Sequence, residues 1–169
     1  IVQNLLDFAR PSGGDKMVRT SINEAIRVAL DLRRNELRME NITLVEELDS
    51  DIPLVLGDAH ELQQVVLNLT INAEQAMTKA HGGGRLFVKS ESTGDVVRVI
   101  VSDSGPGIPS ESLDRLFDPF FTTKDSGEGT GLGLSISYGI IRSHSGNIWV
   151  QSDPPHGATF FIELPPIKT

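Results

Sequence analysis

The sequence predicts an α+β domain, a two-layer sandwich in which about three helices cover one face of a mixed, mostly antiparallel sheet. Three stretches with helical periodicity support this prediction, because apolar side chains recur every three to four residues in 21–40, 58–80 and 132–144. Between them lie pairs of short runs that alternate apolar and polar residues around tight turns, a pattern typical of hairpin strands. Helices interleaved with hairpins favour helices gathered on one face of the sheet.

Length and composition exclude several classes of protein. The 169 residues, 38% hydrophobic and 22% charged, suffice for one folded domain with a sizeable core. The absence of cysteine excludes disulfides and thiolate metal sites and favours a reducing compartment. The net charge of −8 argues against a nucleic-acid partner, and it would also repel a nucleotide unless a cation such as Mg²⁺ screened the site. No apolar run approaches the roughly 20 residues of a membrane helix, so we expect a cytoplasmic domain whose parent protein can still carry a membrane anchor.

The first element is a short amphipathic segment, residues 1–10, which Pro11 ends. A segment of this length is not a stable helix alone, and the chain begins with Ile1 rather than Met. We therefore interpret residues 1–14 as the end of an upstream helical region with its linker, and residues 15–169 as the domain.

Two capping patterns mark where the next helices begin. Ser21 precedes Glu24 by three residues, and Asp58 precedes Glu61 by three. The first helix should extend to about residue 40 and the second to about residue 80, with short strands at 42–48 and 54–56 around the turn between them. The hairpin 86–91 with 96–103, the helix 132–144 and the closing hairpin 147–152 with 158–164 complete the domain.

Two asparagines on the long helix suggest a cation site. Asn68 and Asn72 are four residues apart, so their side chains lie on one surface of the helix. Asparagine is unfavourable inside helices because its amide competes with the backbone. Two stacked amides beside an apolar stripe therefore suggest oxygen ligands for a hard cation, with two solvated polar residues as the alternative.

Two glycine-rich turns flank a polar segment, residues 109–128. The first follows the strand that ends on Asp103 and contains Gly105 and Gly107, where backbone can approach a ligand closely. In the second, alternating glycines open into an apolar helix, and such a loop offers unpaired N–H groups and a positive dipole end to phosphate. These glycines are Gly127, Gly129, Gly131 and Gly133. A carboxylate and a phosphate-binding loop on either side of a mobile segment predict a nucleotide site with a lid, which we expect to be disordered without nucleotide.

With these motifs in order, the sequence resembles the ATP-binding catalytic domain of two-component sensor histidine kinases, of the Bergerat-fold ATPase superfamily. The resemblance covers roughly residues 22–164. The matching motifs are QVVLNLTINA with the asparagine box at 68–72, DSGPG at 103–107 as the first glycine box, FDPFFTTK at 117–124 as the phenylalanine box, GTGLGLS at 129–135 as the second glycine box, and GATF at 157–160 as the closing motif.

The resemblance implies a role for each candidate residue. Asp103 should accept a hydrogen bond from the adenine amino group, with Gly105 and Gly107 letting the base lie against the backbone. Thr159 would hold a bridging water beside Asp103. Asn72, assisted by Asn68, would bind the Mg²⁺ that spans the phosphates of ATP. The remaining nucleotide contacts would come from the lid and its glycine loop, at Thr123, Gly129, Thr130, Gly131, Leu132 and Gly133.

The contact to the terminal phosphate departs from the family pattern. Many members carry a basic residue three positions after the second asparagine, where this chain has Gln75. Lys124 is the candidate catalytic cation instead, with Lys79 as a second possibility and an ordinary solvated lid lysine as the alternative. The lid phenylalanines are expected to pack the lid down or to meet a partner domain rather than touch nucleotide. His144, near a helix end, is expected to be a favourable helix-end charge.

Phosphoryl transfer is favoured over hydrolysis. Related ATPases of the gyrase, mismatch-repair and chaperone type place a glutamate general base one helical turn before the metal-binding asparagine, where this chain has Asn68. An amide does not take a proton at neutral pH, and Glu74, roughly 200° around the helix from Asn72, should point away. A nucleotide-sensing module without catalysis remains a third reading. A dinucleotide site is less favoured because the glycines lack GxGxxG spacing.

The acceptor and the partners are expected outside this chain. None of the four histidines (His60, His81, His144 and His156) has the sequence context of a phosphoacceptor. The resemblance implies a histidine on an upstream helical dimerisation domain, which ends within residues 1–14, and a response regulator receiver domain whose aspartate takes the phosphoryl group. We expect a homodimeric full-length protein, a monomeric fragment and no nucleic-acid partner.

Overall fold

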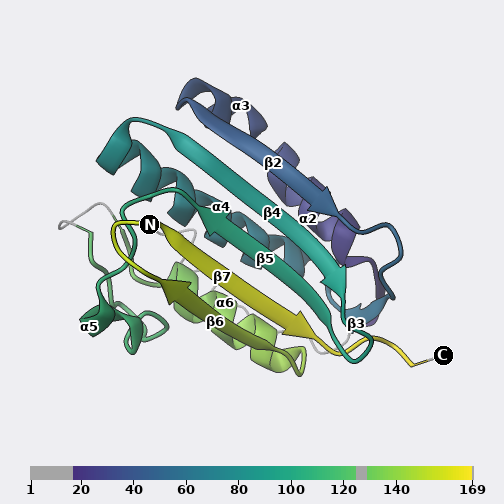
Figure 1. The fold of residues 1–169 in the computed structure, drawn as a ribbon. Coiled ribbons are helices and arrows are strands. Elements are labelled where there is room, and N and C mark those ends of the chain that lie inside the picture. The colour runs from purple at the N-terminus through teal and green to yellow at the C-terminus, as the bar shows by residue number, and fades with distance from the viewer. Residues whose placement is uncertain (1–16, 125–128, 169) are drawn as a thin grey trace.

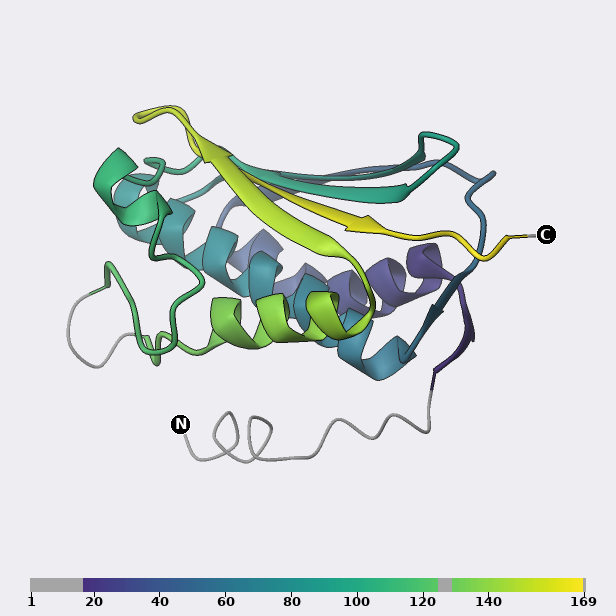
Figure 2. The ribbon, with the colours of Figure 1, turned by 90° about the horizontal axis from the view of Figure 1, so that it is seen from below.

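The computed structural model describes residues 17–124 and 129–168 and confirms the two-layer arrangement, with the sheet in one layer and helices α2, α4 and α6 in the other (Figures 1 and 2). The elements in chain order are β1 (Val18–Thr20), α2 (Ile22–Asp31), α3 (Arg34–Met39), β2 (Ile42–Leu48), β3 (Val55–Gly57), α4 (Ala59–His81), β4 (Gly84–Ser92), β5 (Val97–Asp103), α5 (Ser110–Leu113), α6 (Gly133–Ser143), β6 (Asn147–Ser152) and β7 (Ala158–Leu164). The interpretation of residues 1–14 lies outside the described residues.

The main sheet has the strand order β2-β4-β5-β7-β6. Only β2 and β4 run parallel, and α4 forms part of the crossover between them; the other neighbours are antiparallel. Strands β1 and β3 form a separate two-stranded sheet. The central strand β5 ends on Asp103, so the sheet delivers this carboxylate to the end of the molecule where α5 and the lid lie (Figure 1).

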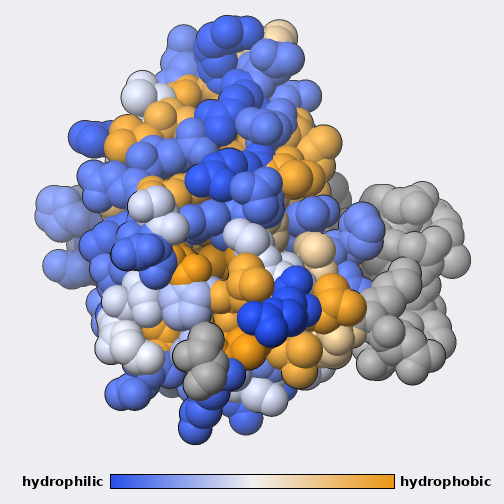
Figure 3. Space-filling view, turned by 90° about the vertical axis from the view of Figure 1, so that its right-hand side faces the viewer, coloured by the Kyte–Doolittle hydropathy of each residue, from blue (hydrophilic) through white to orange (hydrophobic). Residues whose placement is uncertain are grey.

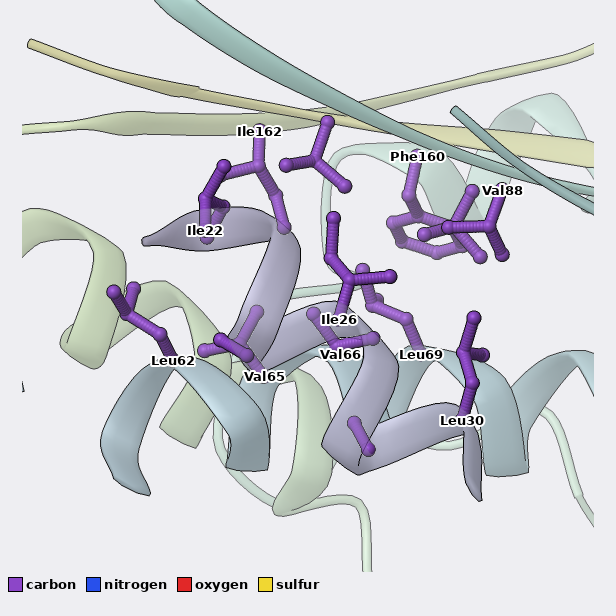
Figure 4. Packing of buried hydrophobic residues seen from close by; sticks show 14 of the residues in the cluster. Ile22, Ile26, Leu30, Leu62, Val65, Val66, Leu69, Val88, Phe160 and Ile162 are labelled. Carbon is purple, nitrogen blue, oxygen red and sulfur yellow. The ribbon is translucent and has the colours of Figure 1, made fainter. Parts of the chain in front are cut away.

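The core lies between the two layers. Ile22, Ile26 and Leu30 of α2 project toward the sheet beside Leu62, Val65, Val66 and Leu69 of α4, and meet Val88, Phe160 and Ile162 from the strands (Figure 4). The apolar stripes read from the sequence therefore face the sheet. Both N-caps form as expected, since Ser21 Oγ accepts from Glu24 N–H at 3.3 Å and Asp58 Oδ1 accepts from His60 N–H at 2.8 Å.

One predicted helix is interrupted in the structure. The expected helix 21–40 breaks at Leu32 and Arg33, although neither glycine nor proline stands there. The break lets Arg33 form a two-pronged ion pair with Glu74 of α4 and lets Leu37 of α3 enter the core. The strands predicted at 42–48 and 54–56 form as β2 and β3 but lie in different sheets, since β2 pairs with β4 and β3 pairs with β1. Strand β1 and the short helix α5 within the lid were not predicted.

His144 is not an exposed helix-end charge. It is only 3% exposed; its Nδ1–H donates to Ile140 O at 2.7 Å, and its Nε2 accepts from Asp58 N–H at 3.0 Å. A ring that donates through one nitrogen and accepts through the other is neutral. Gly57 makes this contact possible, because a Cβ there would lie 2.9 Å from His144 Cδ2. His144 thus fastens the end of α6 to the start of α4.

The end of the molecule away from the lid carries a mixed surface on which apolar (orange) side chains gather (Figure 3). Among the exposed apolar residues of the domain are Val18 of β1 and Leu56 of β3, on paired strands. Within residues 17–124 and 129–168, no helix has both the length and the apolar character needed to cross a membrane.

Candidate nucleotide-binding site

One open cleft collects most of the predicted site residues from four separate segments. It is bounded by α4, the turn after β5, the lid and the start of α6. The predicted residues that line it are Asn68, Asn72, Lys79, Asp103, Gly107, Thr123, Lys124, Gly129, Thr130, Gly131 and Gly133. Gly105, Leu132 and Thr159 were predicted too but do not line it. Ala76, Ile108, Ala158 and Phe160, which add an apolar wall, were not anticipated.

Asp103 is oriented by backbone hydrogen bonds at the end of β5. Its Oδ1 accepts from Gly105 N–H at 2.8 Å and from Ala158 N–H at 3.4 Å. Gly105 is suited to this tight turn, since a Cβ there would meet Asp103 Oδ1 at 2.8 Å. Burial raises the pKa of Asp103 above its ordinary value, although the two backbone donors oppose the shift. With Oδ1 occupied, Oδ2 is the acceptor left for a ligand.

Gly107 lets the turn after β5 lie close to the β6–β7 loop, beside Asp103. Its φ is +81°, a conformation that favours glycine, and a Cβ would meet Ser152 Oγ at 3.0 Å and Gly157 O at 3.1 Å. Ser152 Oγ itself accepts from Ile108 N–H at 2.8 Å. The turn after β5 is therefore held against the β6–β7 loop, which brings its backbone to the wall of the cleft.

The prediction that Thr159 holds a water beside Asp103 was wrong. Thr159 lies opposite Ser102 on the neighbouring strand, and their hydroxyl oxygens are 2.8 Å apart. Successive residues of a strand point to opposite faces, so Thr159 shares the face of Ser102 and not that of Asp103. The β7 residue that reaches Asp103 is Ala158, through its backbone N–H.

Asn68 and Asn72 both line the cleft, but they differ in their contacts. Asn68 Nδ2 donates to Gly133 O at 3.2 Å and to Ser137 Oγ at 3.3 Å, so this amide joins α4 to the first turn of α6. Asn72 Oδ1 accepts from Lys124 Nζ at 3.4 Å. Both side chains therefore line the cleft from the same helix, and the cation site stays a prediction.

The glycine loop is placed by the lid as well as by α6. Gly131 has a φ of +68°, and a Cβ there would come within 2.6 Å of Phe120 O. Phe120 N–H donates to Gly131 O at 2.9 Å. The loop ends at Gly133, where α6 begins, and the first N–H groups of a helix have no partner within it. Backbone donors thus face the cleft from the start of α6.

The lid aromatics hold down the lid, as the sequence suggested. Phe117 packs edge-on to Phe160, with ring centroids 6.5 Å apart, and against Tyr138 of α6 at 5.6 Å. The Arg115 guanidinium lies 4.7 Å from the centroid of the Phe121 ring. Phe120, in contrast, is 68% exposed. The expectation that the lid is disordered without nucleotide stays a prediction, because residues 125–128 lie outside the described residues.

The donor set suits magnesium. Mg²⁺ prefers oxygen ligands and commonly combines one or two protein oxygens with substrate phosphates and water. The amide oxygens of Asn68 and Asn72 are ligands of this kind, and the glycine loop lines the same cleft. Within the described part of the chain, no group of three or more His, Cys, Asp or Glu residues could hold a metal by itself. A cation bound here would therefore depend on the nucleotide.

Glu74 is not available as a general base. The two Glu74 carboxylate oxygens each accept from Arg33 Nη2 at 2.8 Å, and the side chain is largely buried. The residue one turn before Asn72 is Asn68, whose amide is engaged with α6. Glu74 thus lines the cleft with its carboxylate paired to Arg33, whereas Asn68, Asn72 and Gln75 line it with amides.

Comparison with known proteins identifies the family. Residues 57–168 match the family described as histidine kinase-, DNA gyrase B-, and HSP90-like ATPase. The chain is 38% identical over 165 residues to the sensor protein FixL of Bradyrhizobium diazoefficiens, an alignment that covers 98% of this chain. It spans 32% of the length of FixL.

Solved structures agree in fold. The nucleotide-free catalytic domain of the histidine kinase ThkA has a TM-score of 0.77 at 37% identity, covering 89% of this chain and 97% of that one. The structure of ThkA in complex with the response regulator protein TrrA has a TM-score of 0.77 at 31% identity, covering 98% of this chain and 46% of that one. The structure of full-length ShkA in complex with AMPPNP has a TM-score of 0.84 at 27% identity, covering 99% of this chain and 35% of that one. The chain therefore belongs to the histidine kinase-, DNA gyrase B- and HSP90-like ATPase family, and within it is an ATP-binding catalytic domain of the sensor histidine kinase type.

Proposed function

We propose that this domain binds Mg-ATP in the cleft and donates the γ-phosphoryl group to a histidine on an upstream helical dimerisation domain, from which it passes to an aspartate of a response regulator. The relatives support this reading, because one of them was solved with AMPPNP and another with a response regulator. FixL is about three times as long as this chain, which leaves room for such an upstream domain. Since ATP and the regulator are supplied in the cytoplasm, we place the domain there.

The observation that carries the proposal is the meeting of three elements in one cleft. Asp103 lies at one end, the amides of α4 lie along one side, and the glycine loop with the start of α6 lies across from them. Mg-ATP needs a hydrogen-bond acceptor for its base, oxygen ligands for its cation and N–H donors for its phosphates, and these three elements supply them. In the proposed complex, Asp103 Oδ2 accepts from the adenine amino group, and the base lies against the turn that contains Gly105 and Gly107.

The phosphates occupy the other end of the cleft. The N–H groups of the loop from Gly129 to Gly133 bind their oxygens, with the hydroxyls of Thr123 and Thr130 as further donors. Asn72, assisted by Asn68, holds the Mg²⁺, which would neutralise charge on the phosphates. Lys124 reaches the terminal phosphate from the lid, and Lys79, which also lines the cleft, is the second candidate for this contact.

Transfer rather than hydrolysis is supported by two described residues of α4, Asn68 and Glu74, neither of which is available as a general base. A general base contributes roughly 10²–10⁴-fold to a rate. Asn68 is uncharged and bound to α6, and the Glu74 carboxylate is bound by Arg33. Bound ATP should therefore persist until an acceptor histidine arrives in line with the terminal phosphate.

The acceptor lies outside the described domain. His144 is buried and holds two hydrogen bonds. His81 and His156 do not line the cleft, and His60 lies roughly three turns of α4 before Asn72. We assign residues 1–14 to the end of the dimerisation helix and its linker. The full-length protein then dimerises through these helices, and residues 15–169 alone are monomeric.

The test is calorimetric titration with Mg-ATP, followed by chromatography of the nucleotide after an overnight incubation. Binding with ATP recovered nearly intact supports the proposal, and an acid-labile phosphoryl group should then appear on the full-length protein that carries the upstream helices. Rapid conversion of ATP to ADP by the domain alone would favour an ATPase, and the absence of binding would refute the proposed function.

A further inference from the structure

The lid lysine meets α4 at two amide oxygens. Lys124 Nζ donates to Gln75 Oε1 and also to Asn72 Oδ1 at 3.4 Å. Asn72 and Gln75 are three residues apart on α4, a spacing that places their side chains side by side. The ammonium therefore lies on the same oxygen that would hold the cation.

The backbone around Lys124 is shaped for this position. Lys124 N–H donates to Thr122 Oγ1 at 3.0 Å, which bends the lid locally. Gly129 leaves room for the lysine stem, since a Cβ there would meet Lys124 Cδ at 2.9 Å. The stem thus runs past the glycine loop toward α4, and its ammonium ends between the loop and the asparagine.

An amide partner has a specific consequence for a lysine. A carboxylate at position 75 would attract the ammonium more strongly, but it would cancel its charge and repel phosphate. The Gln75 amide oxygen accepts from the ammonium without adding negative charge. Gln75 can therefore keep Lys124 in place after Asn72 Oδ1 has been taken over by a cation.

We propose that Gln75 is a positioning residue, which holds the Lys124 ammonium beside Asn72 so that the lid presents a positive charge to the terminal phosphate. This inference rests on the proposed function and adds a residue to it. Gln75 occupies the position where many family members carry a basic residue of their own. In this chain the positive charge comes from Lys124 of the lid, and α4 supplies the amide oxygen of Gln75 that binds it.

The expected consequence is selective for the third phosphate. Removing Gln75 leaves the adenine contact, the glycine loop and Asn72 unchanged, so ADP should bind as before. A charge-assisted hydrogen bond that is lost or misplaced weakens binding by roughly tenfold or more. We therefore expect Gln75→Ala and Lys124→Ala each to weaken Mg-ATP binding about tenfold while leaving Mg-ADP within about twofold.

The experiment is a double-mutant cycle read by calorimetry with Mg-ATP and Mg-ADP. If Gln75 acts through Lys124, the Gln75→Ala, Lys124→Ala double variant should bind ATP no more weakly than Lys124→Ala alone. Gln151→Ala, on the exposed side of β6 and outside the cleft, is the matched control and should leave both affinities unchanged. Additive losses, or an unchanged ATP affinity in Gln75→Ala, would overturn the inference.

A second readout uses the nucleotide-free protein. Amine acetylation followed residue by residue should label Lys124 several-fold faster in Gln75→Ala than in the wild type, with Lys89 as an internal reference. Gln75→Glu should keep labelling of Lys124 slow yet lose the preference for ATP, which separates position from charge. Equal Lys124 labelling in the wild type and Gln75→Ala would overturn the inference alone, whereas a wild type that binds no Mg-ATP would overturn the proposed function with it.

Discussion

Replacing Asp103 by asparagine should weaken nucleotide binding without lowering the stability of the fold. The asparagine would keep the shape of the side chain, and its amide oxygen can still accept from Gly105 N–H and Ala158 N–H in place of Asp103 Oδ1. The atom that faces the cleft changes from an acceptor oxygen to an NH₂ donor, which would meet the amino group of adenine, also a donor. Hydrogen bonds to charged groups contribute about 1.5–3 kcal/mol, so Mg-ATP should bind roughly 10- to 150-fold more weakly.

The same substitution should not cost stability. Burial raises the pKa of Asp103 above its ordinary 3.8, so the folded domain binds the proton more tightly than the unfolded chain does. The stabilisation by that proton is fully present below the unfolded pKa and is lost as pH rises through the folded pKa. Above the raised pKa of Asp103, the wild type bears an ionised carboxylate at a buried position, which costs free energy. An asparagine side chain avoids this cost, and the melting temperature of the variant should equal or exceed that of the wild type.

The assays are calorimetry with Mg-ATP and Mg-GTP and thermal unfolding across pH. The preference for ATP should fall in the variant, because an asparagine NH₂ can donate to the guanine carbonyl oxygen. The difference in melting temperature should shrink as pH falls through the raised pKa of Asp103 and should be smallest below 3.8. Asp95→Asn, in the exposed β4–β5 turn, is the control. Wild-type affinity for Mg-ATP in Asp103→Asn would refute the assignment of Asp103, and a lower melting temperature at neutral pH would refute the account of its burial.

Three further substitutions test the placement of the site. Gly131→Ala should reduce Mg-ATP affinity at least tenfold, because left-handed backbone costs other residues about 1–2 kcal/mol and the methyl group would meet Phe120 O; Gly139→Ala, which meets nothing within 4 Å, is its calorimetric control. Thr159→Ala should leave Mg-ATP affinity unchanged, since Thr159 faces away from Asp103, and a tenfold loss would contradict the register. His144→Ala should cost about 2–4 kcal/mol from two lost hydrogen bonds and a cavity, seen as a melting temperature roughly 5–15 °C lower.

The parts of the fold that could be predicted from the sequence depend on local patterns. Ser21 and Asp58 begin helices because their side chains accept from N–H groups two or three residues ahead, which the sequence shows directly. The closing strands 147–152 and 158–164 have the predicted bounds, because alternation and the turn between them are local features too. The motifs around Asp103 and Gly131 located the cleft for the same reason.

The parts that could not be predicted depend on distant partners. The break after α2 carries no helix-breaking residue, and it coincides with an ion pair between Arg33 and Glu74, 41 residues apart. His144 was expected to be charged from its place at a helix end, whereas a backbone N–H 86 residues away makes it a neutral acceptor. The error at Thr159 differs, because a local pattern bears on it. Strand alternation puts Ser102 and Asp103 on opposite faces, and Thr159 lies opposite Ser102.

The contacts of Asn68 connect the fold to the choice between transfer and hydrolysis. Helices α4 and α6 are antiparallel and are fastened at both ends, by His144 to the start of α4 and by Asn68 Nδ2 to Gly133 O at the start of α6. The second contact requires a donor at position 68. A glutamate or aspartate there, the group that could activate water, would face the Gly133 carbonyl with a carboxylate oxygen, and two acceptors repel each other. In this chain, therefore, the side chain that joins α4 to the start of α6 also keeps a carboxylate out of position 68, one turn before Asn72.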